Sequence, residues 1–187
     1  SEMCIRDRDN GYAIDTEKFY ENVMNRYKYG GLDTPGLYLD ETTMRICYSH
    51  RRLFAQLAKE LVKQGDNARA QKVLAYAEQA IPAYNVPQVY ESGSYDIATA
   101  YASIGETGKA ITLLNDLISE SRDYIDWAFS LGDSRIEMVQ RDCLYKFWQW
   151  NQCNELLKDM DKERYKQSNQ QFEEKYMRLA QLMNYQN

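Results

Sequence analysis

The stretch that decides the fold is RRLFAQLAKELVKQGDNARAQKVLAYAEQAIP, residues 51–82. Apolar and small residues recur along it at helical spacing, on both sides of the pair Gly65-Asp66. A glycine at this place is typical of a tight turn between two helices. Small side chains at Ala58 and Ala70 allow the two helices to approach closely. The crevice around them is filled by large apolar residues, which are Phe54, Leu61 and Leu74. The stretch therefore predicts a closely packed helical hairpin.

The same spacing resembles the tetratricopeptide repeat. Counted from Arg51 as position 1, eight positions agree with the family pattern. They are the large residues Phe54, Leu57, Leu61 and Leu74, the small residues Ala58, Ala70 and Ala77, and the closing proline Pro82. The resemblance implies an all-α fold in which antiparallel helix hairpins stack as a short tetratricopeptide-like solenoid.

A second, degenerate copy covers residues 91–122 and contains SYDIATAYASIGETGKAITLLNDL. Ala98, Gly105 and Ala110 repeat the positions of Ala58, Gly65 and Ala70. The copy departs from the family pattern at Ser94, where a large residue is usual, and it has no closing proline. The spacing between copies is also longer than the family period, so AYNVPQVYESG is interpreted as an inter-repeat loop.

The residues before the first repeat predict a short helix and a loop. Residues 15–29 have one apolar face, with Asp15 as the N-cap and Gly30-Gly31 as the stop. The loop that follows is expected to be ordered by its own apolar residues, which are Leu37, Tyr38 and Leu39. Asp40 is then expected to cap a new helix that starts near Glu41.

The residues after Asp133 predict further helices. Residues 134–148 and 151–160 look like a third pair without the consensus. Residues 161–183 carry apolar residues at helical spacing on an otherwise charged segment, which predicts a polar-backed capping helix at the C-terminal end. One helical domain is thus expected over residues 9–187.

The first eight residues, SEMCIRDR, resemble the translation of a sequencing adapter and are interpreted as non-native. Three cysteines remain without a CxxC spacing, and buried free thiols are the default expectation. A bridge between Cys143 and Cys153 is conceivable in an oxidising compartment.

Composition excludes several classes of function. The formal net charge is -5 with both signs interspersed, so nucleic acid is not expected as a partner. No apolar run approaches the roughly 18 residues that span a bilayer, so any membrane attachment is expected outside this sequence.

Catalytic and metal chemistry finds little support. His50 is the only histidine, and with Cys47 it could offer two metal ligands from one helix face, but two ligands do not make a site. No GxSxG nucleophile turn occurs, and GETGKA at residues 105–110 fails the phosphate-loop pattern at both ends. We therefore expect no catalytic residue, metal or cofactor, with a small enzyme using His50 as the alternative.

A binding groove is the remaining expectation. In tetratricopeptide repeats the first helix of each pair lines the concave side. The charged, aromatic and hydroxyl residues at the matching positions are Arg52, Lys59, Lys63, Tyr95, Thr99 and Ser103. The remaining matching positions are Ala55, Val62, Ser92 and Ala102. Such a groove is basic at one end and polar at the other, which suits an extended acidic peptide or a chain terminus. The asparagines of the family's carboxylate clamp are absent. A solvated charged face is the alternative.

Residues 12–64, above all YKYGGLDTPGLYLDE at 27–41, resemble the region after the membrane domain in a bacterial family related to protein O-mannosyltransferases. The resemblance implies that the chain is the non-catalytic C-terminal part of a membrane glycosyltransferase-like protein. It also implies contact with the membrane domain and an extracytoplasmic, periplasmic side in preference to the cytoplasm. The alternative is an independent periplasmic or cytoplasmic repeat adaptor.

Overall fold

The computed structural model describes the backbone of residues 4–7 and 11–184. Two short strands, β1 (Cys4–Asp7) and β2 (Gly11–Ile14), pair antiparallel, and every later element is a helix. The prediction of a helical fold is therefore confirmed from Thr16 onward. β1 falls within the eight residues interpreted as non-native, of which residues 1–3 and 8 lie outside the described part. The chain forms two compact units, which divide between Glu106 and Thr107.

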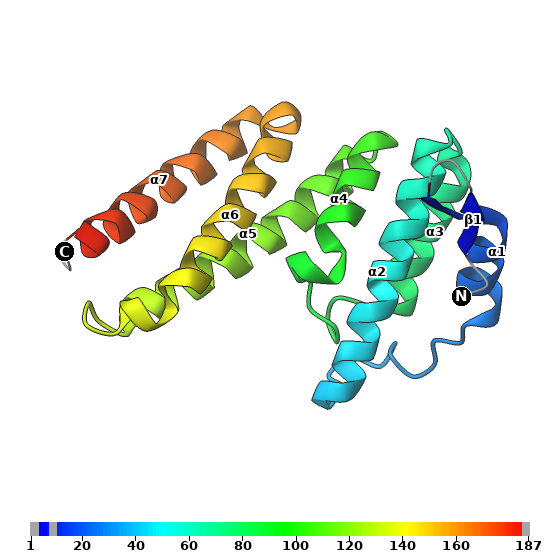
Figure 1. Ribbon diagram of the computed structural model, residues 1–187, viewed down its shortest axis with the longest axis horizontal. Helices are drawn as coiled ribbons and strands as arrows, with labels where there is room; N and C mark the ends of the chain where they lie inside the picture. Colours follow the sequence, from blue (N-terminus) through cyan, green and yellow to red (C-terminus); the bar gives the residue numbers. More distant parts are fainter. Residues whose placement is uncertain (1–3, 8–10, 185–187) are drawn as a thin grey trace. The chain divides into compact units, whose positions relative to one another are not determined.

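The first unit is built around the long helix α2, as Figure 1 shows. Its helical elements are α1 (Thr16–Glu21), the π-helical turn η1 (Asn22–Arg26), α2 (Glu41–Lys63), α3 (Asn67–Ala80), the 3-10 turn η2 (Tyr90–Ser92) and α4 (Ser94–Ser103). Helices α1, α3 and α4 all pack against α2. Asp15 and Asp40 accept hydrogen bonds from backbone N–H groups in the first turns of α1 and α2, which confirms both predicted N-caps.

The hairpin of α2 and α3 confirms the helix pair predicted for the first repeat. Ala58 on α2 and Ala70 on α3 are both fully buried, as expected for residues at a close helix contact. Gly65 adopts a positive φ of 78°, which ends α2 in the left-handed conformation that glycine favours. Asp66 then accepts a hydrogen bond from the Arg69 N–H and caps α3.

The second copy is divided between the two units. Ala98 lies on α4 in the first unit, whereas Ala110 lies on α5 in the second, and both side chains are fully buried. Gly105 has a φ of 85°, so it ends α4 in the same way that Gly65 ends α2. Within the first unit, α4 packs mainly on α2.

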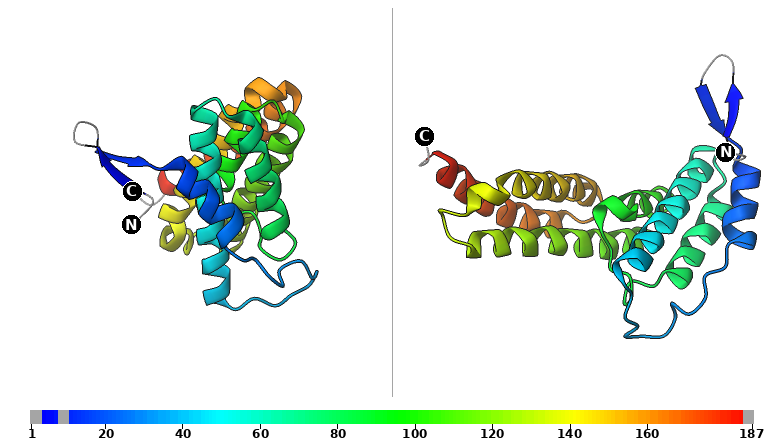
Figure 2. Two further views of the ribbon diagram at one scale, coloured as in Figure 1. Left: turned by 90° about the vertical axis from the view of Figure 1, so that its right-hand side faces the viewer. Right: turned by 60° about the horizontal axis from the view of Figure 1, so that its bottom comes forward.

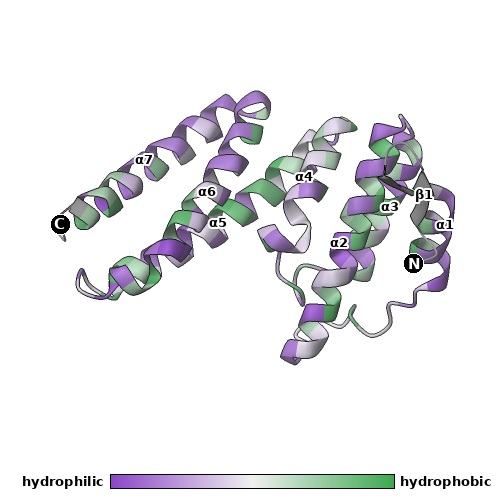
Figure 3. Ribbon diagram, in the orientation of Figure 1, coloured by the Kyte–Doolittle hydropathy of each residue, from purple (hydrophilic) through white to green (hydrophobic). Residues whose placement is uncertain are grey.

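The second unit consists of α5 (Thr107–Ser130), α6 (Ile136–Met160) and α7 (Lys162–Asn184), with α6 packed against both neighbours. Phe172 of α7 meets two buried rings of α6 edge-on, Phe147 at 5.4 Å and Trp150 at 5.7 Å between ring centroids. Figure 3 shows most of α7 as hydrophilic. The predicted C-terminal helix with a polar back is confirmed.

The predicted break between residues 148 and 151 is wrong, because α6 is one continuous helix. No glycine or proline interrupts residues 136–160, and Gln149 and Trp150 at the expected break are fully buried. The continuity also rules out the bridge considered above, since Cys143 and Cys153 lie ten residues apart on this helix, about 15 Å along its axis. A disulfide requires Cα atoms within about 7 Å.

The first predicted helix ends earlier than expected. Regular helix stops at Glu21, η1 continues it to Arg26, and Tyr27 is already extended with a ψ of 131°. Tyr27 and Tyr29 then pack edge-on against His50 of α2, with centroid distances of 5.4 and 5.3 Å. The helix therefore ends before the glycines that were predicted to stop it, at the point where the chain turns toward these contacts.

The loop before α2, the long connection in Figure 2, is held by Asn85 instead of by its own apolar residues. The Asn85 carbonyl oxygen accepts hydrogen bonds from Gly36 N and Leu37 N, and its amide nitrogen donates to Leu32 O and Thr34 O. Leu37 and Tyr38 are 39% and 89% exposed and Leu39 is half-buried, so the prediction that these residues order the loop is wrong for Leu37 and Tyr38.

Candidate functional site

The predicted groove residues lie on two helices that pack side by side, α2 and α4. Two polar contacts of α2 reach α4 and the turn η2 directly before it. The Lys59 ammonium nitrogen lies 4.0 Å from a carboxylate oxygen of Asp96, and Arg52 donates a hydrogen bond of 3.3 Å to the carbonyl oxygen of Glu91. The two rows of residues picked from the sequence therefore belong to one surface, which we call the α2–α4 surface. It comprises Arg52, Lys59, Lys63, Tyr95, Thr99 and Ser103.

Three cations contribute the charge of this surface. Arg52, Lys59 and Lys63 are all exposed on α2. On α4, Thr99 and Ser103 are exposed, and each hydroxyl donates to a carbonyl of its own helix. Both hydroxyl oxygens thus keep lone pairs that can accept from a ligand.

Tyr95 is half-buried and stacks on Tyr90 with ring centroids 4.9 Å apart. This aromatic pair lies at one flank of the α2–α4 surface. Two residues expected in the groove do not line it, because Ala55 and Ser92 are 1% and 2% exposed. They lie at the contact between the helices instead.

Gly93 allows this close contact. Its φ of 87° is strained for other residues, and a Cβ built on it would meet the Cβ of Ala55 and the Cα of Arg52, each at 3.0 Å. No sequence rule used above identified Gly93, although a glycine directly before a helix is a signal for a special backbone conformation.

Arg51 is the second residue that sequence reasoning missed. It is only 2% exposed, and its guanidinium donates hydrogen bonds to the carbonyl oxygens of Ile81, Val86 and Pro87. Burial lowers the pKa of Arg51 to about 10, so the side chain stays charged at neutral pH. Arg51 therefore ties the inter-repeat loop to the face of α2 next to the cations.

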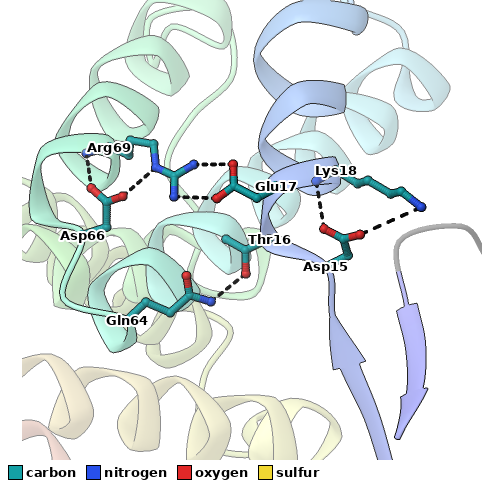
Figure 4. Close-up of polar contacts among 7 residues, drawn as sticks. All are labelled: Asp15, Thr16, Glu17, Lys18, Gln64, Asp66 and Arg69. Carbon is teal, nitrogen blue, oxygen red and sulfur yellow. Dashed lines mark hydrogen bonds and ion pairs between the residues drawn. The ribbon is translucent and has the colours of Figure 1, made fainter.

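The N-terminal helix is fastened to the hairpin by charged contacts, shown in Figure 4. The Arg69 guanidinium forms a fork of 2.9 and 2.8 Å with the two carboxylate oxygens of Glu17 and also donates to Asp66 at 2.6 Å. Gln64 donates to the Thr16 hydroxyl at 2.7 Å. These hydrogen bonds join α1 to the turn between α2 and α3.

Replacing Glu17 by Gln is expected to loosen α1. The hydrogen bonds from Arg69 hold the pKa of Glu17 below its usual value, so this ion pair contributes fully at neutral pH and is lost only as pH falls through that lowered pKa. Trypsin should cut Glu17→Gln faster than wild type after Lys18, Arg26 or Lys28 at pH 7.5. Glu21→Gln is the control, since among the described residues the Glu21 carboxylate accepts a hydrogen bond only from the Asn25 side chain one turn away. Equal cleavage of the two variants would refute the assigned role.

His50 lies among aromatic residues. Its Nδ1 is 3.1 Å from the Tyr29 hydroxyl, and burial lowers the pKa of His50. Within residues 14–183, whose side chains are described, no three of the metal-binding types His, Cys, Asp and Glu come together. The contacts of His50 thus serve to dock the segment after η1 on α2.

No protein family model matches the sequence, and neither a curated protein nor a solved structure is significantly similar to it. Among the described helices, none combines the length and apolar character needed to cross a bilayer.

Proposed function

We propose that this chain is a non-catalytic protein-interaction module that binds an extended, acidic protein segment on the α2–α4 surface. The observation that carries the proposal is the position of three exposed cations on α2 beside exposed hydroxyls on α4. Acidic side chains of a ligand can pair with the cations, while main-chain N–H groups of the ligand can donate to the hydroxyls. The helices that present these groups are held by Arg51, Gly93 and a buried alanine contact.

The proposed architecture is a tetratricopeptide-like solenoid. Support comes from eight matching positions in residues 51–82, the buried Ala58–Ala70 hairpin and the packing of α4 on α2. We further propose, from the resemblance of residues 12–64, that the module belongs to a membrane glycosyltransferase-like protein and faces the periplasm. An independent repeat adaptor is the alternative that this resemblance disfavours.

Charge reversal on α2 tests the proposed binding role. Peptides are first selected from a random display library with the full chain. The double variant Lys59→Glu, Lys63→Glu should bind them at least tenfold more weakly, a change of about 1.4 kcal/mol. The matched control is Lys162→Glu, Lys166→Glu, which reverses two exposed lysines at the same spacing on α7. Unchanged affinity of the α2 variant would contradict the proposal.

A further inference from the structure

The α2 helix starts ten residues before the repeat, and this extension lengthens the basic face. Glu41–Lys63 form one helix, so Arg45 lies on the same helix as the three cations of the α2–α4 surface. Arg45, Arg52 and Lys59 are spaced by seven residues each, and Lys63 follows one turn later. Residues seven apart lie on nearly the same side of a helix. All four side chains are exposed, and we call them the cation row.

The positive charges of the cation row remain available to pair with a ligand. Of the described residues, none forms an ion pair with Arg45 or Lys63. Lys59 pairs with Asp96 at 4.0 Å, but both side chains are at least half exposed, so a ligand carboxylate can replace Asp96 at little cost. Arg52 donates to Ser49 Oγ and to the carbonyl oxygen of Glu91, which fixes its guanidinium on this face without neutralising it.

The spacing of the row sets the spacing of its ligand. Seven residues of α-helix rise about 10 Å. A chain in the extended polyproline II conformation rises about 3.1 Å per residue and turns once in three residues, so every third side chain points to the same side about 9 Å farther along. Acidic residues at every third position of an extended ligand would therefore meet Arg45, Arg52 and Lys59 in turn. A helical ligand would need acidic residues at every seventh position to do the same.

We propose that the partner is an extended protein segment with an acidic residue at every third position, aligned along the cation row. This inference rests on the proposed function and specifies its ligand. Thr99 and Ser103 of α4 are exposed on the same α2–α4 surface as Arg52, Lys59 and Lys63, so they can contact small or polar residues that lie between the acidic ones. Flexible segments of this kind gain affinity by adding charge pairs whose spacing matches.

Three labelled peptides of equal length, each with three glutamates, test the spacing by fluorescence anisotropy with the full chain at low salt. One has its glutamates three residues apart, one has them consecutive at one end, and one is a helical peptide with its glutamates seven residues apart. The peptide with every third position acidic should bind at least fivefold more tightly than the other two. Arg45→Glu should weaken the binding of that peptide at least fivefold. The control Lys72→Glu, at an exposed site of α3, should change its affinity less than twofold.

The outcomes separate the two proposals. One outcome is that all three peptides bind equally and that the double variant Lys59→Glu, Lys63→Glu weakens the binding of each. This outcome would overturn the proposed spacing of acidic residues but would still support binding on the α2–α4 surface. Preference for the helical peptide would overturn the extended ligand. If Arg45→Glu and Lys72→Glu change the peptide affinity equally, the attraction depends on overall charge. That outcome would also overturn the proposed spacing of acidic residues. If no peptide responds to the α2 double variant, the proposed function itself fails.

Discussion

Replacing Arg51 by alanine is expected to destabilise the first unit by about 3–4 kcal/mol. The substitution removes the donors for three main-chain carbonyls, those of Ile81, Val86 and Pro87, of which the first two form buried hydrogen bonds and the third a part-buried one. Each buried polar group left unpaired costs about 1–3 kcal/mol. In the variant the loop is expected to relax partly and admit water. The loss of stability should therefore be smaller than the sum of the costs of three unpaired carbonyls. Arg51→Lys should recover part of the loss, since an ammonium cannot reproduce the fork of donors.

Urea unfolding followed by circular dichroism measures the Arg51 effect. The neighbouring Arg52→Ala is the matched control, because Arg52 is exposed and its loss should change the free energy of unfolding by about 0.5 kcal/mol or less. Trp127, Trp148 and Trp150 are the only tryptophans and all belong to the second unit, so their fluorescence reports that unit alone. Similar unfolding free energies for the Arg51 and Arg52 variants would rule out the structural role of Arg51.

Local signals in the sequence predicted where α1 and α2 begin and where α2 ends. Asp15 and Asp40 cap helices because their carboxylates reach N–H groups three residues away, an interaction that needs no distant partner. Gly65 likewise ends α2 through its own backbone conformation. The buried pair Ala58 and Ala70 was predictable because a known repeat pattern links these positions across the turn.

Contacts between distant residues were not predictable in the same way. Asn85 orders a loop about fifty residues before it, and Arg51 binds carbonyls thirty to thirty-six residues later. Neither residue belongs to a motif, since any asparagine or arginine near a loop carries the same local signal. The false break in α6 has a related cause, because Gln149 is polar in sequence yet fully buried by its neighbours.

The candidate surface was predictable only in part. The repeat register placed Lys59 and Lys63 correctly on an exposed face, because the helical period alone determines that face. Gly93 lies directly against Ala55 and Arg52 of α2, and Ala55 and Ser92 are buried where the two helices approach. The approach distance of two helices is a tertiary property that a single sequence does not state.

Replacing Gly93 by alanine is therefore expected to affect both stability and binding. An alanine at a φ of 87° costs about 1–2 kcal/mol in any surroundings. Here its Cβ would also lie 3.0 Å from the Cβ of Ala55 and from the Cα of Arg52, both fixed to the α2 backbone. Such overpacking costs about 1–3 kcal/mol more, or is relieved when α4 moves away from α2.

Gly65→Ala and Gly105→Ala isolate the contribution of the helix contact. Both glycines have a similar positive φ, of 78° and 85°, but a Cβ on either would meet nothing within 4 Å. Urea unfolding should therefore show Gly93→Ala less stable than either control by about 1–3 kcal/mol. If α4 moves outward to relieve the clash, the cations of α2 separate from the hydroxyls of α4, and peptide binding should weaken in Gly93→Ala but not in the controls. Equal stability of the three variants would show that the close approach of α4 to α2 does not depend on Gly93.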